Sequence, residues 1–227
     1  MPVTHELSRD PAMEHIRRHV GMDRIRPAGA DDLASIAAIH HGSGTPGLLA
    51  DLGPAFLEQV YYRGILESPI AETYVIELDQ ALVGVVSLTT DADRLFTLVF
   101  RRRLLLAARL AIAASVRRPR ILRDLFATVL DVRRNPLGGG INAEVISLQV
   151  APRYQGVGLG LFLLQRATDR LMQLGAVPFK SRMLASNTAV TRLYAFLGFH
   201  MAGSYPLHGR IWEMWIHDGP SIEAKAL

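Results

Sequence analysis

Residues 150–160 of the chain read VAPRYQGVGLG, and this stretch decides the fold. An apolar segment with the pattern of a strand precedes it, and a long segment with the apolar periodicity of a helix follows it. The glycines at positions 156, 158 and 160 carry no Cβ, so successive backbone N–H groups at the helix start can approach an anion closely. The stretch therefore predicts a phosphate-binding loop between a strand and a helix.

The glycine spacing excludes two common phosphate loops. A dinucleotide-binding turn has the pattern G-x-G-x-x-G, and here the third glycine comes one residue early. A P-loop continues into G-K-[ST], and no lysine follows Gly160. On its own, the stretch is also compatible with a tight connection between a strand and a helix.

A second segment, residues 187–199, reads NTAVTRLYAFLGF. Its apolar residues recur at helical spacing, and Gly198 follows where a left-handed cap would end a helix. The two segments together resemble the two signatures of the GNAT superfamily of N-acetyltransferases. The first signature is V-x-P followed by Q-x-x-G-x-G, and the second is N-x-x-A-x-x-L-Y-x-x-x-G-F. The second pattern is matched except that Val190 stands in place of the alanine.

The resemblance implies an α/β GNAT fold, in which helices flank a mixed, mostly antiparallel central sheet. It covers most of residues 22–218, with residues 1–21 expected as an N-terminal extension and 219–227 as a C-terminal tail. The chain departs from the family at about 91–140, where a helical insertion is expected before the cofactor-binding strand. The implied cofactor is acetyl-coenzyme A.

Hydrophobic periodicity, turn residues and capping residues predict the order of elements. Strands are expected at 24–27, 73–78, 81–89, 144–150, 177–184, 199–205 and 210–217. Helices are expected from Asp31 and Asp32 to about 41, at 54–66, at 159–174 and after Asn187, while 42–53 is rich in turn residues.

The resemblance also implies the contacts with the cofactor. Its pyrophosphate would lie on a loop formed by Gln155, Gly156, Val157, Gly158, Leu159 and Gly160. Backbone groups of Leu148, Gln149 and Val150 would pair with the pantetheine arm like an added half-strand, and the Val150 N–H is also an oxyanion donor. Asn187 would contact the arm or the phosphates, although an asparagine at a helix start also suits an N-cap.

Acyl transfer to an amine needs a proton acceptor, because amines of the lysine type have a pKa of about 10.4. Glu144 is the candidate general base. With period two it is expected to share a face with Ile146, Leu148 and Val150, an apolar setting that would raise its pKa. A structural glutamate, or one that faces solvent, is the alternative. Tyr194 is the candidate general acid, as the resemblance implies, since its phenol can donate to the leaving thiol.

The insertion carries the basicity of the chain. Arg94 to Arg134 contains eleven Arg and two Asp, a balance of +9, whereas the whole chain carries +4. Two helical pieces are expected, at 95–116 and 121–132, broken near Pro119. The segment 94–134 could be a solvated arginine face, an acceptor lid that holds an anionic substrate, or an interfacial element on acidic lipid. Nucleic acid is not expected, because interleaved aromatics and binding motifs are missing.

Composition sets further bounds. The chain has no cysteine, which excludes disulfides, thiolate metal sites and a cysteine nucleophile, and no metal ligand set is evident. No apolar run is long enough for a membrane span, and residues 1–22 do not resemble a signal peptide, so a cytoplasmic location is expected. A homodimer is left open.

The expected function is direct transfer of an acetyl group from acetyl-coenzyme A to the primary amine of a small molecule, through a ternary complex with general acid and base catalysis. The charge of the insertion favours an anionic acceptor, such as a nucleotide-linked amino sugar. Two alternatives stay open: an acetyltransferase of protein lysines or N-termini, and a non-catalytic coenzyme A-binding protein whose basic helical element docks a partner.

Overall fold

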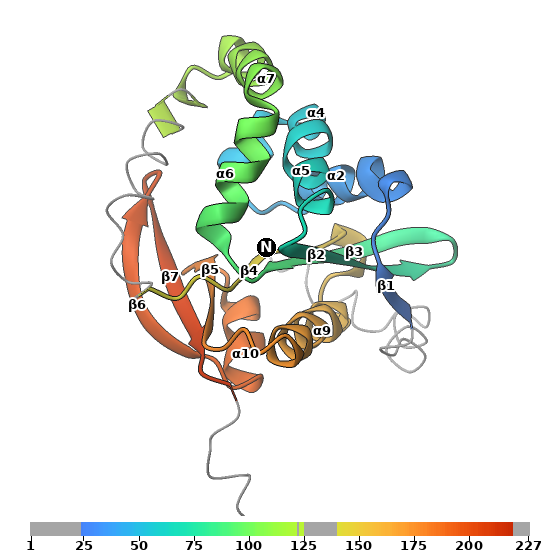
Figure 1. The fold of residues 1–227 in the computed structure, drawn as a ribbon, viewed down its shortest axis with the longest axis vertical. Helices are drawn as coiled ribbons and strands as arrows, with labels where there is room; N and C mark the ends of the chain where they lie inside the picture. Colours follow the sequence, from blue (N-terminus) through green and yellow to red (C-terminus); the bar gives the residue numbers. More distant parts are fainter. Residues whose placement is uncertain (1–23, 122, 125–139, 220–227) are drawn as a thin grey trace, which may run out of the picture.

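The computed structural model describes residues 24–121, 123–124 and 140–219, and its centre is a seven-stranded sheet (Figure 1). The strand order is β1-β2-β3-β4-β5-β7-β6. All neighbouring pairs are antiparallel except β4 and β5, which run parallel. The strands are β1 (Ile25–Pro27), β2 (Ala71–Leu78), β3 (Ala81–Thr89), β4 (Glu144–Val150), β5 (Phe179–Leu184), β6 (His200–Leu207) and β7 (Arg210–His217). The expected mixed, mostly antiparallel sheet is confirmed.

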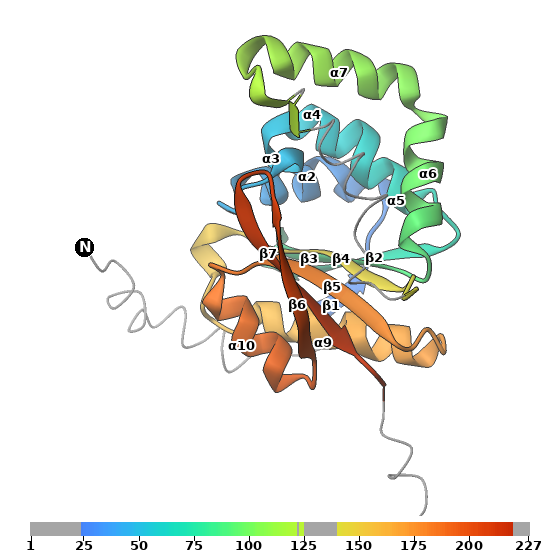
Figure 2. The ribbon, with the colours of Figure 1, turned by 90° about the vertical axis from the view of Figure 1, so that its left-hand side faces the viewer.

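Helices cover both faces of this sheet, as Figure 2 shows. On one side lie η3 (Ala30–Asp32), α2 (Leu33–Gly42), α3 (Leu48–Leu52), α4 (Pro54–Phe56), η4 (Leu57–Tyr62), α5 (Arg63–Leu66), α6 (Ala92–Arg102) and α7 (Leu104–Arg117). On the other side lie α9 (Leu159–Gln173) and α10 (Thr188–Phe196), and the short η6 (Pro152–Tyr154) follows β4. None of the helices in the described part of the chain is both long enough and apolar enough to cross a bilayer.

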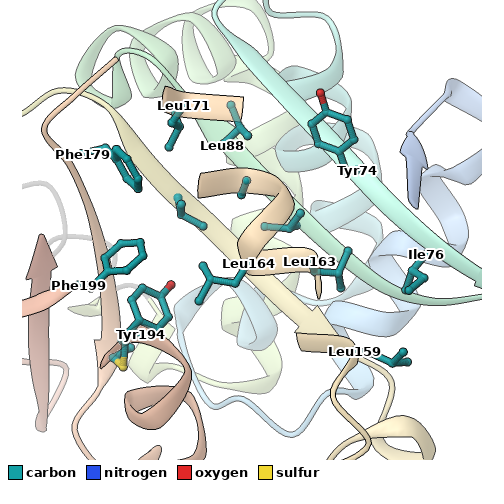
Figure 3. Close-up of a cluster of buried hydrophobic side chains, with 14 of the residues drawn as sticks. Tyr74, Ile76, Leu88, Leu159, Leu163, Leu164, Leu171, Phe179, Tyr194 and Phe199 are labelled. Atoms are coloured by element: carbon teal, nitrogen blue, oxygen red, sulfur yellow. The ribbon is translucent and has the colours of Figure 1, made fainter. Parts of the chain in front are cut away.

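Each face of the sheet has its own hydrophobic core. Below the sheet, α9 buries Leu163, Leu164 and Leu171 against β2, β3 and β4, and α10 adds Tyr194 (Figure 3). Above the sheet, α2 and the continuous helix 54–66 bury a second set, which includes Tyr61 and Tyr62. The two cores fix β4 from both sides, so the direction of each β4 side chain is strongly determined.

The expected elements are largely present, with one clear correction between the first two helices. Residues 42–53 were expected as turns, but Leu48–Leu52 forms α3. Leu52 is buried, and Leu48 and Leu49 pack against the upper core. Burial of these leucines outweighs the turn preference of the surrounding glycines and proline. The expected helix 54–66 is confirmed, and its middle, η4, has π-helical hydrogen bonding.

The insertion begins as two helices instead of the single piece expected at 95–116. Asp91 caps α6 by accepting a hydrogen bond from the Arg94 N–H at 3.0 Å. The chain leaves the helical conformation at Arg103, with φ −128° and ψ 23°, and resumes as α7. Ion pairs of Arg103 with Glu67 and of Arg118 with Asp51 attach the insertion to the upper helices. The second expected piece, 121–132, lies almost entirely outside the described residues.

Candidate active site

The candidate site lies where β4 separates from β5. β4 pairs with β3 from Glu144 to Val150, but its pairing with β5 is confined to Glu144 and Val145. Within the described residues, no strand pairs with the β5-facing edge of residues 146–150. Backbone N–H and C=O groups require partners, so this edge can accept a ligand that carries amide groups of its own.

A β-bulge at Ile146 determines the direction of Glu144. Ser147 pairs with Ser87 and Val145 pairs with Leu88, so Ile146 has no partner in β3. Leu148 and Val145 therefore pack in the lower core with α9, while Ile146 packs in the upper core. Since side chains alternate along a strand, Glu144 points to the upper side. The prediction that Glu144 shares a face of β4 with Leu148 and Val150 is therefore wrong, and Glu144 shares a face with Ile146 only among the three residues expected.

Glu144 is buried, with 3% of its surface exposed, which rules out the solvent-facing alternative. Its setting is not apolar. Oε1 accepts a hydrogen bond from Arg182 Nε at 2.9 Å, and Arg182 Nη2 lies 2.9 Å from the same oxygen. The Glu144 charge holds the pKa of Arg182 above its usual value. Oε2 is also buried and has no hydrogen-bond partner among the described residues, so one carboxylate oxygen is free to accept a proton or a hydrogen bond.

Tyr194 lies on the opposite, lower side of the same strands. Its hydroxyl is 2.6 Å from Ser181 Oγ, and Ser181 Oγ donates to the Val145 carbonyl at 3.0 Å. Because Ser181 has a single hydroxyl proton, Tyr194 must be the donor in the bond between them. Burial raises the pKa of Tyr194, which makes its phenol a weaker acid. This environment favours hydrogen-bond donation by Tyr194 over complete proton transfer.

The glycine loop presents backbone to open space. Gly158 is the N-cap of α9 with φ +98°, no side chain caps this helix start, and Gly156 has φ +79°. A Cβ at either position would meet no atom within 4 Å. Gly160 also has a packing role, because a Cβ there would contact Leu193 Cδ1 at 3.4 Å, so this glycine allows α9 and α10 to pack closely.

Side chains of the loop hold it in place. Val157 and Leu159 are buried in the lower core, so only their backbone groups can face a ligand. Gln155 Nε2 donates to the Val150 carbonyl at 3.0 Å and to the Ser43 carbonyl at 3.1 Å. Gln155 therefore joins the loop to the end of β4 and to the end of α2.

Two further predicted residues also have structural contacts. The Asn187 side chain accepts a hydrogen bond from the Val190 N–H at 3.3 Å, so the N-cap interpretation is confirmed. Gln149 is buried, and its Oε1 accepts a hydrogen bond from Thr45 Oγ1 at 3.3 Å. Its side chain thus fixes the loop after α2, while its backbone pairs with Val85 of β3 and faces away from the free edge of β4.

Sequence reasoning missed a buried polar chain above β4. His40 Nδ1 lies 2.7 Å from the Tyr62 hydroxyl, which lies 2.9 Å from Ser147 Oγ. Burial lowers the pKa of His40 to about 4, so the imidazole is neutral at pH 7. Arg182 and Ser181 were missed as well. A polar residue at each of three successive positions, 180–182, inside an otherwise apolar strand was the signal that could have indicated them.

Comparison with solved structures supports the same fold. The ribosomal-protein-S18-alanine N-acetyltransferase from Escherichia coli is 16% identical, with 89% of this chain and 98% of that chain covered and a TM-score of 0.53. YncA from Salmonella typhimurium, solved with its cofactor acetyl-CoA, is 20% identical over 87% and 94%, with a TM-score of 0.52. Mutant forms of the spermidine/spermine N-acetyltransferase SpeG from Vibrio cholerae are 16% identical over 89% and 98%, with a TM-score of 0.51.

A family model adds the decisive comparison. No curated protein sequence matches the chain at a significant level. The model of the acetyltransferase (GNAT) family, however, matches residues 47–199, which is more than half of the chain and includes both β4 and the glycine loop. Enzymes of this family use acetyl-coenzyme A, which is the cofactor expected from the sequence. The chain belongs to the acetyltransferase (GNAT) family.

Proposed function

We propose that the protein transfers an acetyl group directly from acetyl-coenzyme A to a primary amine of a small molecule, within one ternary complex. The observation that carries this proposal is the opening between β4 and β5. Where the two strands still pair, Glu144 lies on the upper side of the sheet and Tyr194 on the lower side. Val145 follows Glu144 in β4, and its carbonyl accepts a hydrogen bond from Ser181, which in turn contacts the Tyr194 hydroxyl. A proton acceptor and a proton donor therefore flank the position at which an amine and a thioester would meet.

The described residues fit the cofactor. The start of α9, which has no side-chain cap, and the open space around the Cβ positions of Gly156 and Gly158 suit a pyrophosphate, because the positive end of the helix dipole favours an anion there. The free edge of β4, to which the Leu148 backbone and the Val150 N–H point, suits the amide groups of the pantetheine arm. Asn187 would contact that arm or the phosphates through its amide nitrogen while its oxygen caps α10. Bound acetyl-coenzyme A supplies the acetyl group as an activated thioester.

Glu144 is the proposed general base. Oε2 is free, and Arg182 fixes the carboxylate through Oε1, so the reactive oxygen is held in one position. The amine would approach from the upper side, give a proton to Oε2 and attack as a neutral nitrogen. The Val150 N–H would donate to the developing oxyanion from the edge of β4.

Tyr194 is the proposed acid group of the reaction, and it acts as a hydrogen-bond donor to the leaving thiolate. Its hydroxyl would turn from Ser181 towards sulfur as negative charge develops there. Because burial raises the pKa of Tyr194, we assign it a hydrogen bond that stabilises the thiolate, with full protonation following from solvent. Ser181 would keep the hydroxyl oriented in the resting enzyme.

The glycine loop gives the first prediction. Gly158→Val should weaken coenzyme A binding about tenfold or more, measured by calorimetry, because a side chain would occupy the space above the start of α9. The matched control is Gly175→Val, at the other end of α9. Gly175 also has a positive φ, +67°, and open space around its Cβ position, so it carries the same backbone strain. An equal loss of coenzyme A affinity in both variants would contradict the assignment of the glycine loop as the pyrophosphate site, since backbone strain alone would then explain the loss.

The second prediction concerns Tyr194. Tyr194→Phe keeps the ring in the lower core and removes the hydroxyl, so kcat should fall about 10²-fold or more with little change in coenzyme A affinity. Ser181→Ala removes the resting partner but leaves the donor, so kcat should fall far less. Unchanged turnover in Tyr194→Phe would make this residue a core tyrosine only.

The third prediction uses pH. Glu144→Gln keeps an oxygen for Arg182 but cannot accept a proton, so the rate should fall about 10²-fold or more and the acidic limb of the pH profile should disappear. Glu72→Gln is the control, because Glu72 also pairs with an arginine, Arg170, at 2.8 Å on another part of the sheet. A slower Glu144→Gln enzyme that retains the acidic limb would point to another base.

The position of α6 bears on the class of acceptor. α6 begins beside the site, where the Ala92 N–H donates to the Asn142 carbonyl at 2.8 Å, and it rises about 15 Å to the exposed Arg101 and Arg102. An anionic acceptor that reaches them must be long, which suits a nucleotide-linked amino sugar better than a small acid. The similar structures instead carry the names of enzymes for a protein alanine and for polyamines, so these acceptor classes are the alternatives.

The fourth prediction separates these classes. Release of coenzyme A thiol is measured with nucleotide-linked amino sugars, polyamines and peptides, for the wild type and for Arg101→Gln/Arg102→Gln. If the acceptor is anionic, the variant should have a raised acceptor KM and an unchanged coenzyme A affinity. The wild-type acceptor KM should also rise with salt, because salt screens the attraction between the arginines and the acceptor; the Debye length is about 10 Å at 0.1 M and shortens as salt is added. Best turnover of a polyamine or a peptide would contradict it, and so would a blank panel with intact coenzyme A binding.

A further inference from the structure

Helix α7 exposes several large apolar side chains. Its fully buried positions carry the small residues Ala107, Ala111 and Ser115, and Leu106 and Leu110 are half-buried against the upper core. Its outer face carries large apolar residues, with Leu105 87%, Ile112 62% and Val116 81% exposed. A helix on the surface of a globular protein normally buries its large apolar side chains and exposes polar ones. The exposed leucine, isoleucine and valine of α7 therefore need a partner outside the chain as described.

These residues form one continuous stripe. Leu105, Ala108, Arg109, Ile112, Ala113 and Val116 are all exposed and follow helical spacing, and we call them the outer face of α7. In Figures 1 and 2, α7 is the outermost helix of the upper layer, beyond α4, and it lies on the far side of the molecule from α9 and α10. A flat surface could reach the outer face of α7 without meeting the lower half of the protein.

The charges around the outer face of α7 favour an anionic partner over a second copy of the chain. From Arg94 to Arg123 the sequence contains no Asp or Glu. Exposed arginines lie before the outer face, within it and after it; they are Arg101, Arg102, Arg109, Arg118 and Arg120. Among them Arg118 also pairs with Asp51. Two copies of the chain that met through this face would bring arginines against arginines, whereas an anionic surface would be attracted along the whole length of the helix.

The shape of the element also favours a surface over a span. At 14 residues, α7 is about 21 Å long, which is shorter than a bilayer span requires. A helix with apolar side chains on one face and arginines at its flanks can lie in the headgroup region, with the apolar groups inserted and the guanidinium groups at the phosphates.

We propose that the outer face of α7 docks the protein on an anionic lipid bilayer, with Leu105, Ile112 and Val116 inserted and Arg109, Arg118 and Arg120 bound to lipid phosphates. This orientation places the helices α3 and α4 between the lipid and the sheet, since α7 contacts both of them. The residues of this contact are different from the residues of the candidate site, so lipid binding and activity can be measured separately.

The test uses the full chain and two kinds of vesicle, phosphatidylcholine alone and phosphatidylcholine with phosphatidylglycerol. The wild type should cosediment with the anionic vesicles only, and less strongly as salt is raised. Leu105→Ser/Ile112→Ser/Val116→Ser should weaken this binding about tenfold or more, because inserted apolar area is lost. The matched control is Met201→Ser/Ile211→Ser, which removes two exposed apolar side chains from the β6–β7 hairpin and should leave binding unchanged.

A charge variant keeps the test decisive if the triple variant folds poorly. Arg109→Gln/Arg120→Gln should weaken binding about fivefold for each charge removed while the melting temperature stays near that of the wild type. The proposal is overturned by equal binding of the wild type to neutral vesicles, by loss of binding in the hairpin control, or by unchanged binding in both α7 variants. Self-association of the wild type that the triple variant abolishes, without vesicle binding, would overturn it in favour of a second copy of the chain.

Discussion

The early separation of β4 from β5 is the constraint on which the site depends. The two strands run parallel and pair at only two positions, Glu144 and Val145, so the rest of β4 has backbone groups on one side without a neighbouring strand. The Val150 carbonyl accepts a hydrogen bond from Gln155. The remaining groups of this edge must bind water or a ligand, because unpaired backbone in a protein interior is costly. The glycine loop continues directly from this free edge into α9. An extended arm with a phosphate at one end can therefore be held by backbone alone.

The bulge at Ile146 acts at the same place and separates the two proposed chemical groups. Without it, Glu144 would share the lower core with Leu148 and would lie beside Tyr194. With it, the carboxylate turns into the upper layer, where Arg182 neutralises it. The hydrogen-bonded chain of His40, Tyr62 and Ser147 lies on the same side of β4. A buried carboxylate is costly without such a partner, so the ion pair with Arg182 is a condition for having Glu144 at this position at all.

The parts of this arrangement that could be predicted from the sequence are the local ones. The bounds of the strands 144–150 and 210–217, the N-cap at Asn187 and the glycine loop followed from residue types at fixed spacing. The direction of Glu144 did not, because an apolar residue such as Ile146 suits either face and gives no sign of an extra residue in the ladder. The pairing with Arg182 joins two strands that are distant in the sequence, and α3 depends on burial among helices that local turn preferences do not reveal.

The opposite placement of Glu144 and Tyr194 has a consequence for the proton balance of the proposed reaction. The amine loses a proton to Glu144 on the upper side of the sheet. The thiolate forms on the lower side, where Tyr194 stabilises it by a hydrogen bond. No proton has to cross the sheet during transfer, since Glu144 can return its proton to solvent after the product leaves. The raised pKa of Tyr194 fits this division, because a phenol that only donates a hydrogen bond keeps its proton throughout, and the thiolate takes its proton from solvent. A site of this kind needs a preorganised donor more than a strong acid, and the bond from Tyr194 to Ser181 supplies that preorganisation.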